Sequence, residues 1–565
     1  MDQGCTEQIL SEDYFDFIVA NNEIPEGLAS LPGFCYDIIN NVHSAVYVPI
    51  SKLPGKIIKD FPYSILPKCF GLLDIESLNQ TGVAKIQNNP FLNLLGSGVL
   101  VGIVDTGIEY THQAFRNPDG TTRIFSIWDQ TINRNGSKPI GFYYGTEYTQ
   151  DQINLALVSS DPLSLVPSTD TNGHGTALAG IAAGSRNDTE NFSGVAVNSQ
   201  FVIVKLKSAK KALRDFFLIP PDAECFQEND IMLGIKYLLS IAGKLQRPIS
   251  ICIGVGTSQG PHSSRHALSN YLTTISDQKG IGVTIAAGNE GNTRHHYSAN
   301  VDAAIGYDTV DLNVGPDNKG FSMELWGNSP NVFSIDVLSP AGQYVPRIPA
   351  RLKETREIDF IFENTKLFID YELVESQAGN ELILIRFQNP SEGIWRFRVY
   401  STIEIEPKFN IWLPIHSFLE ENTFFLKPDP YYTLTSPGNS MTPIITTSYN
   451  YMDNSLAIDA SRGYTVTNLI NPTFAAPGVN MIVPTLKNSY AVMSGTSISA
   501  AFTAGVVAML LEWGIVNGNQ TQLDTLQIKN FLIRGAKRDR NIVYPNREWG
   551  YGILDVFSAF SNLQN

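Results

Sequence analysis

Three short motifs along this chain place a carboxylate, an imidazole and a hydroxyl close to glycine residues. They are Val104-Asp105-Thr106-Gly107, Gly173-His174-Gly175-Thr176 and Ser494-Gly495-Thr496-Ser497. A serine hydroxyl is a weak nucleophile at neutral pH, and it becomes reactive when an imidazole takes its proton and a buried carboxylate orients that imidazole. We therefore predict acyl-transfer chemistry, with Ser497 as nucleophile, His174 as general base and Asp105 as the residue that orients the base.

The residues that flank each motif predict the elements that hold it. Asp105 follows the apolar run 99–104, which is typical of a buried parallel strand, and open α/β sheets place their sites at the carboxyl ends of such strands. His174 and Ser497 each precede a run of small and apolar residues, 176–184 and 498–511, which predicts a helix. The amino terminus of a helix offers free N–H groups and a positive potential to developing negative charge.

A fourth motif supplies a hydrogen-bond donor. The apolar residues 285–288 lead into Asn289, whose amide is suited to bind an oxyanion, an interaction worth roughly 3 to 4 kcal/mol in enzymes of this type. Taken singly, each motif also has a structural interpretation as a turn or a helix cap. The four together, in this order, favour catalysis. Three serines, Ser494, Ser497 and Ser499, lie close together in the last motif, and the choice of Ser497 among them rests on the family resemblance given below.

Composition limits the classes of protein that this chain can represent. It has 565 residues, of which 43% are hydrophobic and 17% charged, which predicts a globular protein of two to four domains. A net charge of -15 without a long Lys/Arg block argues against a nucleic-acid partner. The first residues lack a basic stretch followed by an apolar one, so we expect no signal peptide, and we find no run long enough for a membrane span.

The cysteines favour an intracellular protein. There are five of them, an odd number spread widely along the chain, at Cys5, Cys35, Cys69, Cys225 and Cys252. We expect all of them to be free thiols of a chain that folds inside a cell. Since Cys-x-x-Cys spacing is missing, we expect no metal site.

Changes in pattern along the chain predict four segments. Residues 1–75 contain strand-like runs at 15–19, 44–50 and 69–75 and suit a small α+β unit, either a prodomain or an ordinary N-terminal domain. Strands alternate with helices in 76–306 and again in 426–565, which predicts an α/β fold, a parallel sheet with helices on both faces. Residues 307–425 hold short strands without helices, which predicts an inserted β-sandwich or jelly roll that adds stability and no catalytic group.

The order Asp105, His174, Ser497, with Asn289 before the serine, resembles the subtilase family of serine proteases from about Thr81 to Asp555, apart from the β-rich insert. This resemblance implies a subtilisin-like fold and hydrolysis of peptide bonds. It also favours Ser497 as the nucleophile, because the nucleophile of this family follows Gly-Thr, and Ser494 and Ser499 are then interpreted as turn or cap hydroxyls. It also implies that residues 1–75 are a prodomain that assists folding and then leaves its carboxyl end in the active site. The backbones of Cys252-Ile253-Gly254 and Ala286-Ala287-Gly288 are expected to line the S1 pocket, as the matching segments do in subtilases.

More narrowly, the chain is similar to the clostridial spore germination proteases called Csp. The shared features are the missing signal peptide, the short prodomain, the elaborated segment that includes Tyr143-Tyr144-Gly145-Thr146, and the β-rich insert. This resemblance implies limited proteolysis of a cortex-lytic enzyme precursor in the germinating spore. It also implies a cleaved prodomain that stays bound, and a jelly roll that packs on the catalytic domain and rigidifies it. The expected partners are therefore a protein substrate and the chain's own prodomain, and the expected location is the spore, after synthesis in the cytoplasm.

Several questions stay open on the sequence alone. Residues 185–191 occupy the region of a calcium loop in many secreted subtilases and carry suitable oxygens, but they do not match the usual loop, so we favour a solvated turn and no cofactor.

We expect self-cleavage between about Leu72 and Gln80. The main alternative is a pseudoprotease that binds or signals, with residues near Ile75 plugging the cleft. A weaker alternative is a β-sandwich adhesin or carbohydrate module with a vestigial catalytic core.

Overall fold

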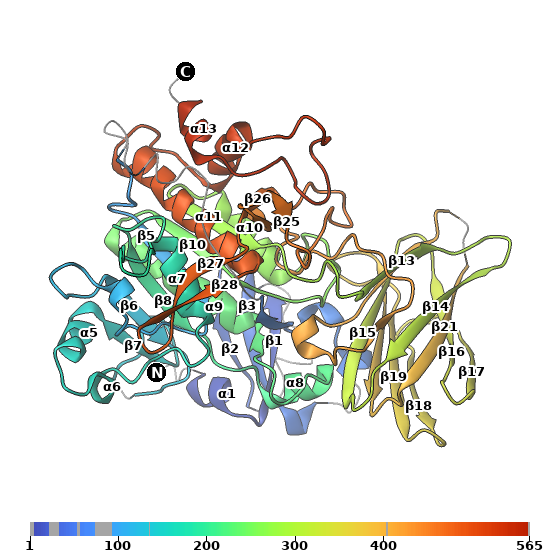
Figure 1. Ribbon diagram of the computed structural model, residues 1–565. Helices are drawn as coiled ribbons and strands as arrows, with labels where there is room; N and C mark the ends of the chain where they lie inside the picture. The colour runs from blue at the N-terminus through green and yellow to red at the C-terminus, as the bar shows by residue number, and fades with distance from the viewer. Residues whose placement is uncertain are drawn as a thin grey trace.

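A nine-stranded sheet lies at the centre of the computed structural model, which describes residues 5–21, 33–53, 57–73, 87, 93–134, 136–402 and 405–562 (Figure 1). The strand order is β25-β24-β12-β10-β5-β8-β6-β7, with β26 beside β24. Neighbouring strands are parallel except at the two edges, where β7 and β25 run antiparallel. The strands are β5 (Leu100–Asp105), β6 (Ile124–Asp129), β7 (Thr146–Thr149), β8 (Gln200–Lys205), β10 (Ile249–Ile253), β12 (Ile281–Ala286), β24 (Ile444–Asn450), β25 (Ser455–Leu456) and β26 (Phe474–Pro477).

Helices cover both faces of this sheet, as the alternation of strand and helix predicts. Val101 and Ile103 of β5 face the core that contains α7 (His174–Ala183) and α11 (Thr496–Leu511), while Leu100 and Val104 face α9 (Glu228–Leu245) and α10 (Ala267–Ser276). The predicted α/β fold is therefore confirmed. Smaller helices are α5 (Gln150–Leu157), α6 (Pro162–Leu165), α8 (Lys211–Phe217), α12 (Thr525–Gly535), α13 (Val556–Ser561) and the 3-10 turn η3 (Gln113–Phe115).

Helix α11 differs from the expectation that no apolar run of this chain is long enough to span a membrane. Together with the π-helical turn η5 (Glu512–Val516), it forms a stretch, Thr496–Val516, that is long and apolar enough to cross a membrane by composition. Of an 18-residue apolar segment within this stretch, 89% is buried inside the fold. The apolar character on all sides of α11 follows from its central position, because it packs against α7 and the sheet at once.

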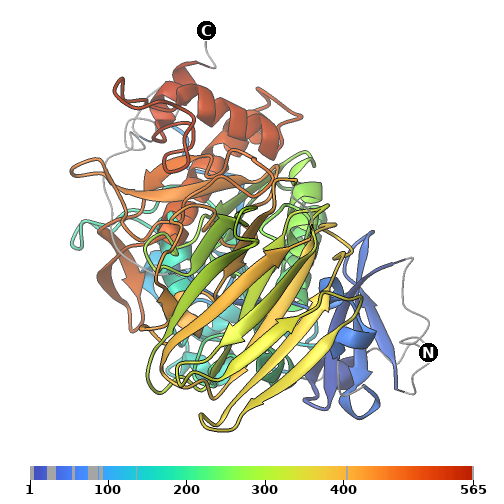
Figure 2. The same ribbon diagram turned by 90° about the vertical axis from the view of Figure 1, so that its right-hand side faces the viewer.

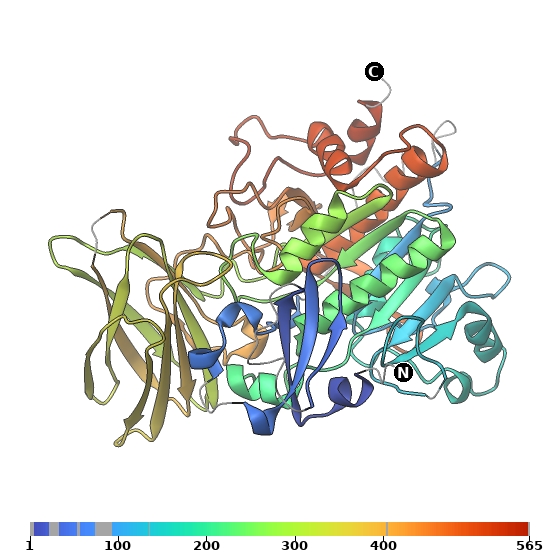
Figure 3. The same cartoon turned by 180° about the vertical axis from the view of Figure 1, so that it is seen from behind.

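The N-terminal unit is a three-stranded antiparallel sheet that packs against the catalytic domain. Its strands are β1 (Tyr14–Ala20), β3 (His43–Pro49) and β2 (Cys35–Ile38), in that spatial order. Ile18 and Tyr47 lie in the same apolar cluster as α9 and α10, and Figure 3 shows this sheet in blue beside those helices. Short elements accompany the sheet: α1 (Thr6–Leu10), η1 (Ile50–Lys52), α3 (Ile57–Asp60), η2 (Tyr63–Ile65) and β4 (Cys69–Leu72).

The cysteines of this unit overturn the expectation that all five are free. Cys5 and Cys35 form a disulfide, which ties the start of α1 to β2 across 30 residues of chain. Cys69, Cys225 and Cys252 are free and buried. The odd, spread pattern of five cysteines concealed the pair, because pairing depends on how the N-terminal sheet brings the two ends of the segment together.

The insert is a β-sandwich of two antiparallel sheets, and Figure 2 shows it facing the viewer. Its six-stranded sheet contains β13 (His296–Asn300), β22 (Lys408–Trp412), β15 (Gly320–Gly327), β20 (Glu381–Gln388), β19 (Thr365–Glu372) and β18 (Thr355–Phe360). Its five-stranded sheet contains β17 (Tyr344–Ile348), β16 (Phe333–Leu338), β21 (Gly393–Ser401), β14 (Tyr307–Val314) and β23 (Phe424–Phe425).

Both faces of strand β20 in the six-stranded sheet are buried. Ile383 and Ile385 point into the sandwich core, while Leu382 and Leu384 pack in a cluster with α8 and the N-terminal unit. The insert also starts earlier than residue 307, since β13 pairs with β22 from His296 onward. The short polar strand β13 does not show the alternation by which the other strands of the insert can be recognised.

Three short elements complete the fold near the catalytic motifs. Strand β4 lies between β11 (Val255–Gly256) and β9 (Phe226–Gln227) in a small antiparallel sheet. The 3-10 turn η4 (His416–Phe418) follows β22. A β-ribbon of β27 (Met481–Thr485) and β28 (Ser489–Met493) precedes α11.

Candidate active site

The four predicted catalytic residues meet at one end of the central sheet. Asp105 is the last residue of β5, His174 the first residue of α7 and Ser497 the second residue of α11, while Asn289 follows β12. All four are buried, with exposed fractions of 0%, 3%, 0% and 4% respectively. The parallel order of β5, β10 and β12 explains the meeting, because the carboxyl ends of parallel strands lie along one edge.

Asp105 holds the imidazole of His174 in a defined orientation. His174 Nδ1 lies 2.7 Å from Asp105 Oδ1, and the backbone N–H of Thr106 donates to the same oxygen at 2.8 Å. A carboxylate accepts hydrogen bonds only, so Nδ1 carries the proton and Nε2 is left to accept one. This is the tautomer that a general base for a serine requires.

Asp170 fixes the start of α7 and was missed by the sequence analysis. Its Oδ1 accepts from the backbone N–H of Gly173 at 2.8 Å, and its Oδ2 accepts from the N–H of Thr176 at 3.0 Å and from the Thr176 hydroxyl at 2.7 Å. These bonds satisfy free N–H groups at the helix start and so position His174 between them. An aspartate four residues before the histidine was the available signal.

Ser497 lies against a backbone carbonyl of the N-terminal unit. Its Oγ donates to the carbonyl oxygen of Leu73, and His174 Nε2 is 3.4 Å from the same oxygen. Leu73 directly follows β4. The nucleophile and the base of the predicted triad therefore converge on one peptide carbonyl.

The amide of Asn289 is oriented by the residue before the nucleophile. Asn289 Oδ1 accepts from the backbone N–H of Thr496 at 3.2 Å and from its hydroxyl at 2.9 Å, and the Thr496 hydroxyl accepts from the N–H of Gly288 at 3.0 Å. With the amide oxygen engaged in this way, the amide nitrogen is directed away from Thr496, as a donor to an oxyanion must be. This contact of Thr496 with Asn289 is not evident from the sequence.

The neighbouring serines have structural partners. Ser499 Oγ donates to the carbonyl of Ala476 at 3.0 Å, and Ser494 Oγ accepts from the N–H of Asn480 at 3.2 Å. Both contacts join the start of α11 to neighbouring segments of the fold. Ser499 lies within α11, whose N-cap is Gly495, so its hydroxyl is not a cap and bonds to β26 instead. Among these three serines, the one with its hydroxyl at the Leu73 carbonyl is Ser497.

The residues predicted to line S1 separate into two groups. Cys252 and Ala286 share an apolar cluster with Leu73, whereas the side chains of Ile253 and Ala287 belong to the cluster on the opposite face of the sheet. Burial and the nearby Asp105 carboxylate raise the pKa of the Cys252 thiol, which keeps it protonated.

Glycines keep the cleft open beside Leu73. A Cβ at Gly254 would lie 3.1 Å from His174 Cε1 and 3.4 Å from Ser497 Cβ. A Cβ at Gly288 or at Gly256 would lie 2.6 Å from Thr435 Oγ1, and at Gly256 also 3.2 Å from Leu73 Cδ1. Thr435 and Gly256 are thus additional lining residues, and Thr435 carried no signal in the sequence.

Strand β4 lies in the cleft as an added β-strand. Leu72 pairs with Val255 and Gly71 with Gly256 on one side, and Phe70 pairs with Phe226 on the other. This is how an extended peptide binds to exposed strand edges, through backbone hydrogen bonds with side chains directed into pockets. The segment 69–73 therefore lies in the cleft as an extended strand paired on both sides.

The acid that follows Asn289 anchors the cleft to the insert. Glu290 Oε1 accepts from the backbone N–H of His416 at 3.0 Å and lies 2.8 Å from its Nδ1, while Oε2 lies 3.1 Å from His295 Nδ1. Although burial opposes ionisation, the hydrogen bonds from His295 and His416 lower the pKa of Glu290 to about 2. A charged, buried carboxylate thus connects the loop that follows β12 and carries Asn289, called the oxyanion loop below, to η4.

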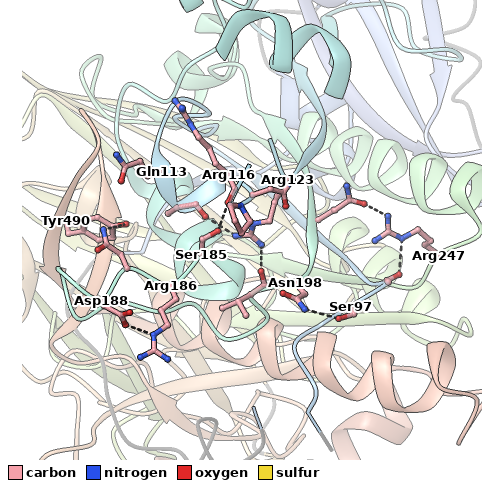
Figure 4. Close-up of a pocket in the computed structure, with 17 residues that line it drawn as sticks. Ser97, Gln113, Arg116, Arg123, Ser185, Arg186, Asp188, Asn198, Arg247 and Tyr490 are labelled. Carbon is pink, nitrogen blue, oxygen red and sulfur yellow. Dashed lines mark hydrogen bonds and ion pairs between the residues drawn. The ribbon is translucent and has the colours of Figure 1, made fainter. Parts of the chain in front are cut away.

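The region considered for calcium already contains a cation, the guanidinium of Arg123. A cavity of about 840 Å³ next to residues 185–188 is lined by several arginines (Figure 4). The Arg123 guanidinium is almost fully buried and donates to four carbonyls, those of Val197 at 2.8 Å, Ser199 at 2.9 Å, Ala114 at 2.9 Å and Ala183 at 2.5 Å.

Within the loop itself, the exposed carboxylate of Asp188 pairs with Arg186 at 2.5 Å. The carbonyls that Arg123 engages lie on the segments around the loop and not in it. Burial lowers the pKa of Arg123 to about 10, a value at which it stays charged at neutral pH. Among the described residues, no group of three or more His, Cys, Asp or Glu side chains is arranged to hold a metal ion.

The fold and the arrangement of these residues are of the subtilisin type. The family model for the subtilase family matches residues 96–323 and 421–552, which is more than half of the chain, and the chain belongs to that family. The gap between the two matched segments falls within the β-sandwich insert.

Among solved structures, the chain is similar to the CspB protease of Clostridium perfringens. The TM-score is 0.76 at 31% identity, over 86% of this chain and 96% of that one. Among curated relatives, it is 21% identical over 504 residues to the C5a peptidase of Streptococcus pyogenes serotype M18, covering 82% of this chain and 40% of that protein. It is 26% identical over 265 residues to thermitase of Thermoactinomyces vulgaris, covering 47% of this chain and 71% of that protein. The chain thus spans about two fifths of the length of the C5a peptidases that it matches.

Proposed function

We propose that this chain is an endopeptidase that cleaves its own peptide bond after Leu73 and then retains the N-terminal segment in its cleft. The observation that supports this most directly is the contact of Ser497 Oγ and His174 Nε2 with the Leu73 carbonyl. Strand pairing on both sides of β4 holds that carbonyl in place. Such positioning replaces a bimolecular encounter with an intramolecular one.

The geometry supports a defined order of bond changes. Ser497 Oγ adds to the carbonyl carbon of Leu73 while His174 Nε2 takes the hydroxyl proton. The negative charge then forms on the carbonyl oxygen, where the amide of Asn289 stabilises it. The C–N bond between Leu73 and Asp74 breaks as His174 returns the proton to the leaving nitrogen. Water finally hydrolyses the acyl-enzyme. Residues 74–80 of the expected cleavage window lie outside the described residues.

Contacts beyond the catalytic residues support retention of the N-terminal segment. The backbone N–H of Cys69 donates to Gln259 Oε1 at 2.8 Å, and that of Lys68 donates to Glu228 Oε2 at 3.1 Å, both in buried surroundings. Breaking buried hydrogen bonds of this kind leaves polar groups unsatisfied. The retained segment therefore acts as an inhibitor until it is displaced.

The similarity to CspB supports a biological role. We infer that the displaced enzyme acts by limited proteolysis on a protein substrate, a precursor of a cortex-lytic enzyme, in the germinating spore. The whole-length similarity to the CspB chain supports this inference. On the same basis we infer a zymogen associated with the spore, and the fit at Arg123 supports a fold that needs no calcium.

Intact mass and N-terminal sequencing of the wild type beside Ser497→Ala test the proposed self-cleavage. The wild type is expected to show two fragments on a denaturing gel, with a new N-terminus at Asp74, and to elute as one species on gel filtration. Ser497→Ala is expected to stay a single chain, and Ser494→Ala serves as the matched control that cleaves normally. A wild type that stays intact would favour the alternative, a pseudoprotease whose cleft is plugged by its own strand.

A further inference from the structure

Gly71 lies at a crowded position of the strand in the cleft. If Leu73 provides the scissile carbonyl, as proposed above, then Leu73, Leu72 and Gly71 occupy subsites S1, S2 and S3. Gly71 pairs with Gly256 across β4 and β11. On an ordinary substrate strand, alternate side chains point away from the pocket, and a residue at this position would then be free to vary.

A side chain at position 71 would force its neighbours to shift. A Cβ there would lie 2.6 Å from Ile415 Cδ1, 2.8 Å from Ser417 Oγ and 3.2 Å from Phe418 Cε1. All three atoms belong to the insert, at and just before η4. They come from three different residues, so the added carbon has no single neighbour whose movement would relieve the contacts.

The segment 415–418, which contacts position 71, is held in place by apolar packing and by hydrogen bonds to Glu290. Ile415 and Phe418 are buried, with exposed fractions of 0% and 1%, in a cluster that also contains Trp412. Between them, His416 is bound through its backbone and its ring to the carboxylate of Glu290. Because the cluster is packed and the turn is tied to the oxyanion loop, the whole segment resists displacement.

Backbone conformation does not explain the glycine. Gly71 lies within a regular antiparallel pairing and is not among the glycines with a positive φ. Residues with side chains adopt this extended conformation readily. The restriction at position 71 is therefore one of space, which makes it testable with substitutions that add or remove single atoms.

We propose that the insert closes subsite S3 of this peptidase and restricts its substrates to glycine at P3. The substrate class is then an extended protein segment with glycine two residues before the P1 residue and with apolar residues at P2 and P1, where Leu72 and Leu73 are buried. The inference rests on the proposed cleavage after Leu73. It gives the insert a role in specificity in addition to stability.

The self-cleavage rate of Gly71→Ala tests this proposal. We expect it to be slower than that of the wild type by about tenfold or more, because overpacking of a filled site displaces the strand. Gly243→Ala on α9 is the matched control, since a Cβ there meets nothing within 4 Å. Adding Ile415→Val and Ser417→Gly to Gly71→Ala removes the two nearest atoms, and is expected to restore at least half of the lost rate on a logarithmic scale.

A second measurement is independent of catalysis. In the Ser497→Ala background, amide hydrogens of residues 69–72 are expected to exchange faster when Gly71→Ala is added, and to regain protection when Ile415→Val and Ser417→Gly are added as well. Equal protection with and without Gly71→Ala would overturn the S3 proposal, as would equal cleavage rates at the same bond. A wild type that fails to cleave, with the exchange pattern as expected, would instead refute only the proposed self-processing.

Discussion

At the scale of single residues, the pairing of Thr496 with Asn289 determines which atom of the amide faces the substrate. Thr496 engages the amide oxygen through both its backbone N–H and its hydroxyl. An amide that was free to flip would present oxygen to the developing oxyanion for part of the time, which would repel it. We therefore infer that Thr496 supports the proposed role of Asn289 without contacting the reacting atoms itself.

We expect Asn289→Ala to reduce the rate of self-cleavage by roughly 10² to 10³, because the donor acts on the charge that forms in the transition state. The time course of fragment formation on a denaturing gel measures this rate. Asn292→Ala, at an exposed position three residues further on, is the control and should cleave like the wild type. A rate for Asn289→Ala within a factor of two of the wild type would remove this residue from the oxyanion site.

At the scale of elements, Arg123 connects segments that are distant in sequence. Its guanidinium donates to the carbonyl of Ala183 at the end of α7, to that of Ala114 in η3, and to Val197 and Ser199 before β8. A cation at the carboxyl end of a helix also interacts favourably with the helix dipole. One side chain therefore fixes the end of the helix that carries His174 at its start.

We expect Arg123→Met to lower the free energy of unfolding by about 3 kcal/mol, because it leaves several buried carbonyls unsatisfied. Thermal unfolding followed by circular dichroism measures the change. Arg186→Ala is the matched control, since its ion pair with Asp188 is exposed and is expected to contribute less than about 1 kcal/mol. Calcium or a chelator is expected to leave the melting temperature of the wild type unchanged. A rise with calcium would contradict the proposal that Arg123 takes the place of such an ion.

At the scale of the whole molecule, three units share one buried junction. Tyr63 of the N-terminal unit donates its hydroxyl to Glu324 of the insert, and Gly260 of the catalytic domain donates its N–H to the same carboxylate at 2.9 Å. Burial raises the pKa of Glu324, and the hydrogen bonds of the junction oppose that rise. The N-terminal unit and the catalytic domain thus each donate a hydrogen bond to a carboxylate of the insert. Removal of the N-terminal segment would take away the Tyr63 donor and expose the junction.

We expect Tyr63→Phe to speed dissociation of the cleaved N-terminal segment by about tenfold, since Glu324 then loses one of its buried donors. Gel filtration at increasing times after dilution measures the fraction that remains bound. Tyr36→Phe, at a position that is 49% exposed on β2, removes the same hydroxyl group from the surface and should dissociate like the wild type. Dissociation of Tyr63→Phe at the wild-type rate would show that this contact does not hold the segment.

The α/β fold and the positions of the candidate catalytic residues at strand and helix ends were predictable because their signals are local. Asp105 closes an apolar strand, and His174 and Ser497 each begin a helix of small residues, so neighbouring residues alone predict where each group lies. The β-sandwich was predictable from its alternating strands, but its first strand was not. Strand β13 is polar along much of its length, and only its pairing with β22 shows that the insert starts at His296.

By itself, the sequence determined which residue types are available for acyl transfer and which elements carry them. Only the tertiary structure decided that Leu73 lies at Ser497, that Arg123 joins four carbonyls, and that Cys5 pairs with Cys35. Leu73 and Ser497 are 424 residues apart, and no periodicity or motif relates them. Contacts of this kind depend on how whole units pack, because a side chain's partner across the fold is set by the positions of all the elements between them.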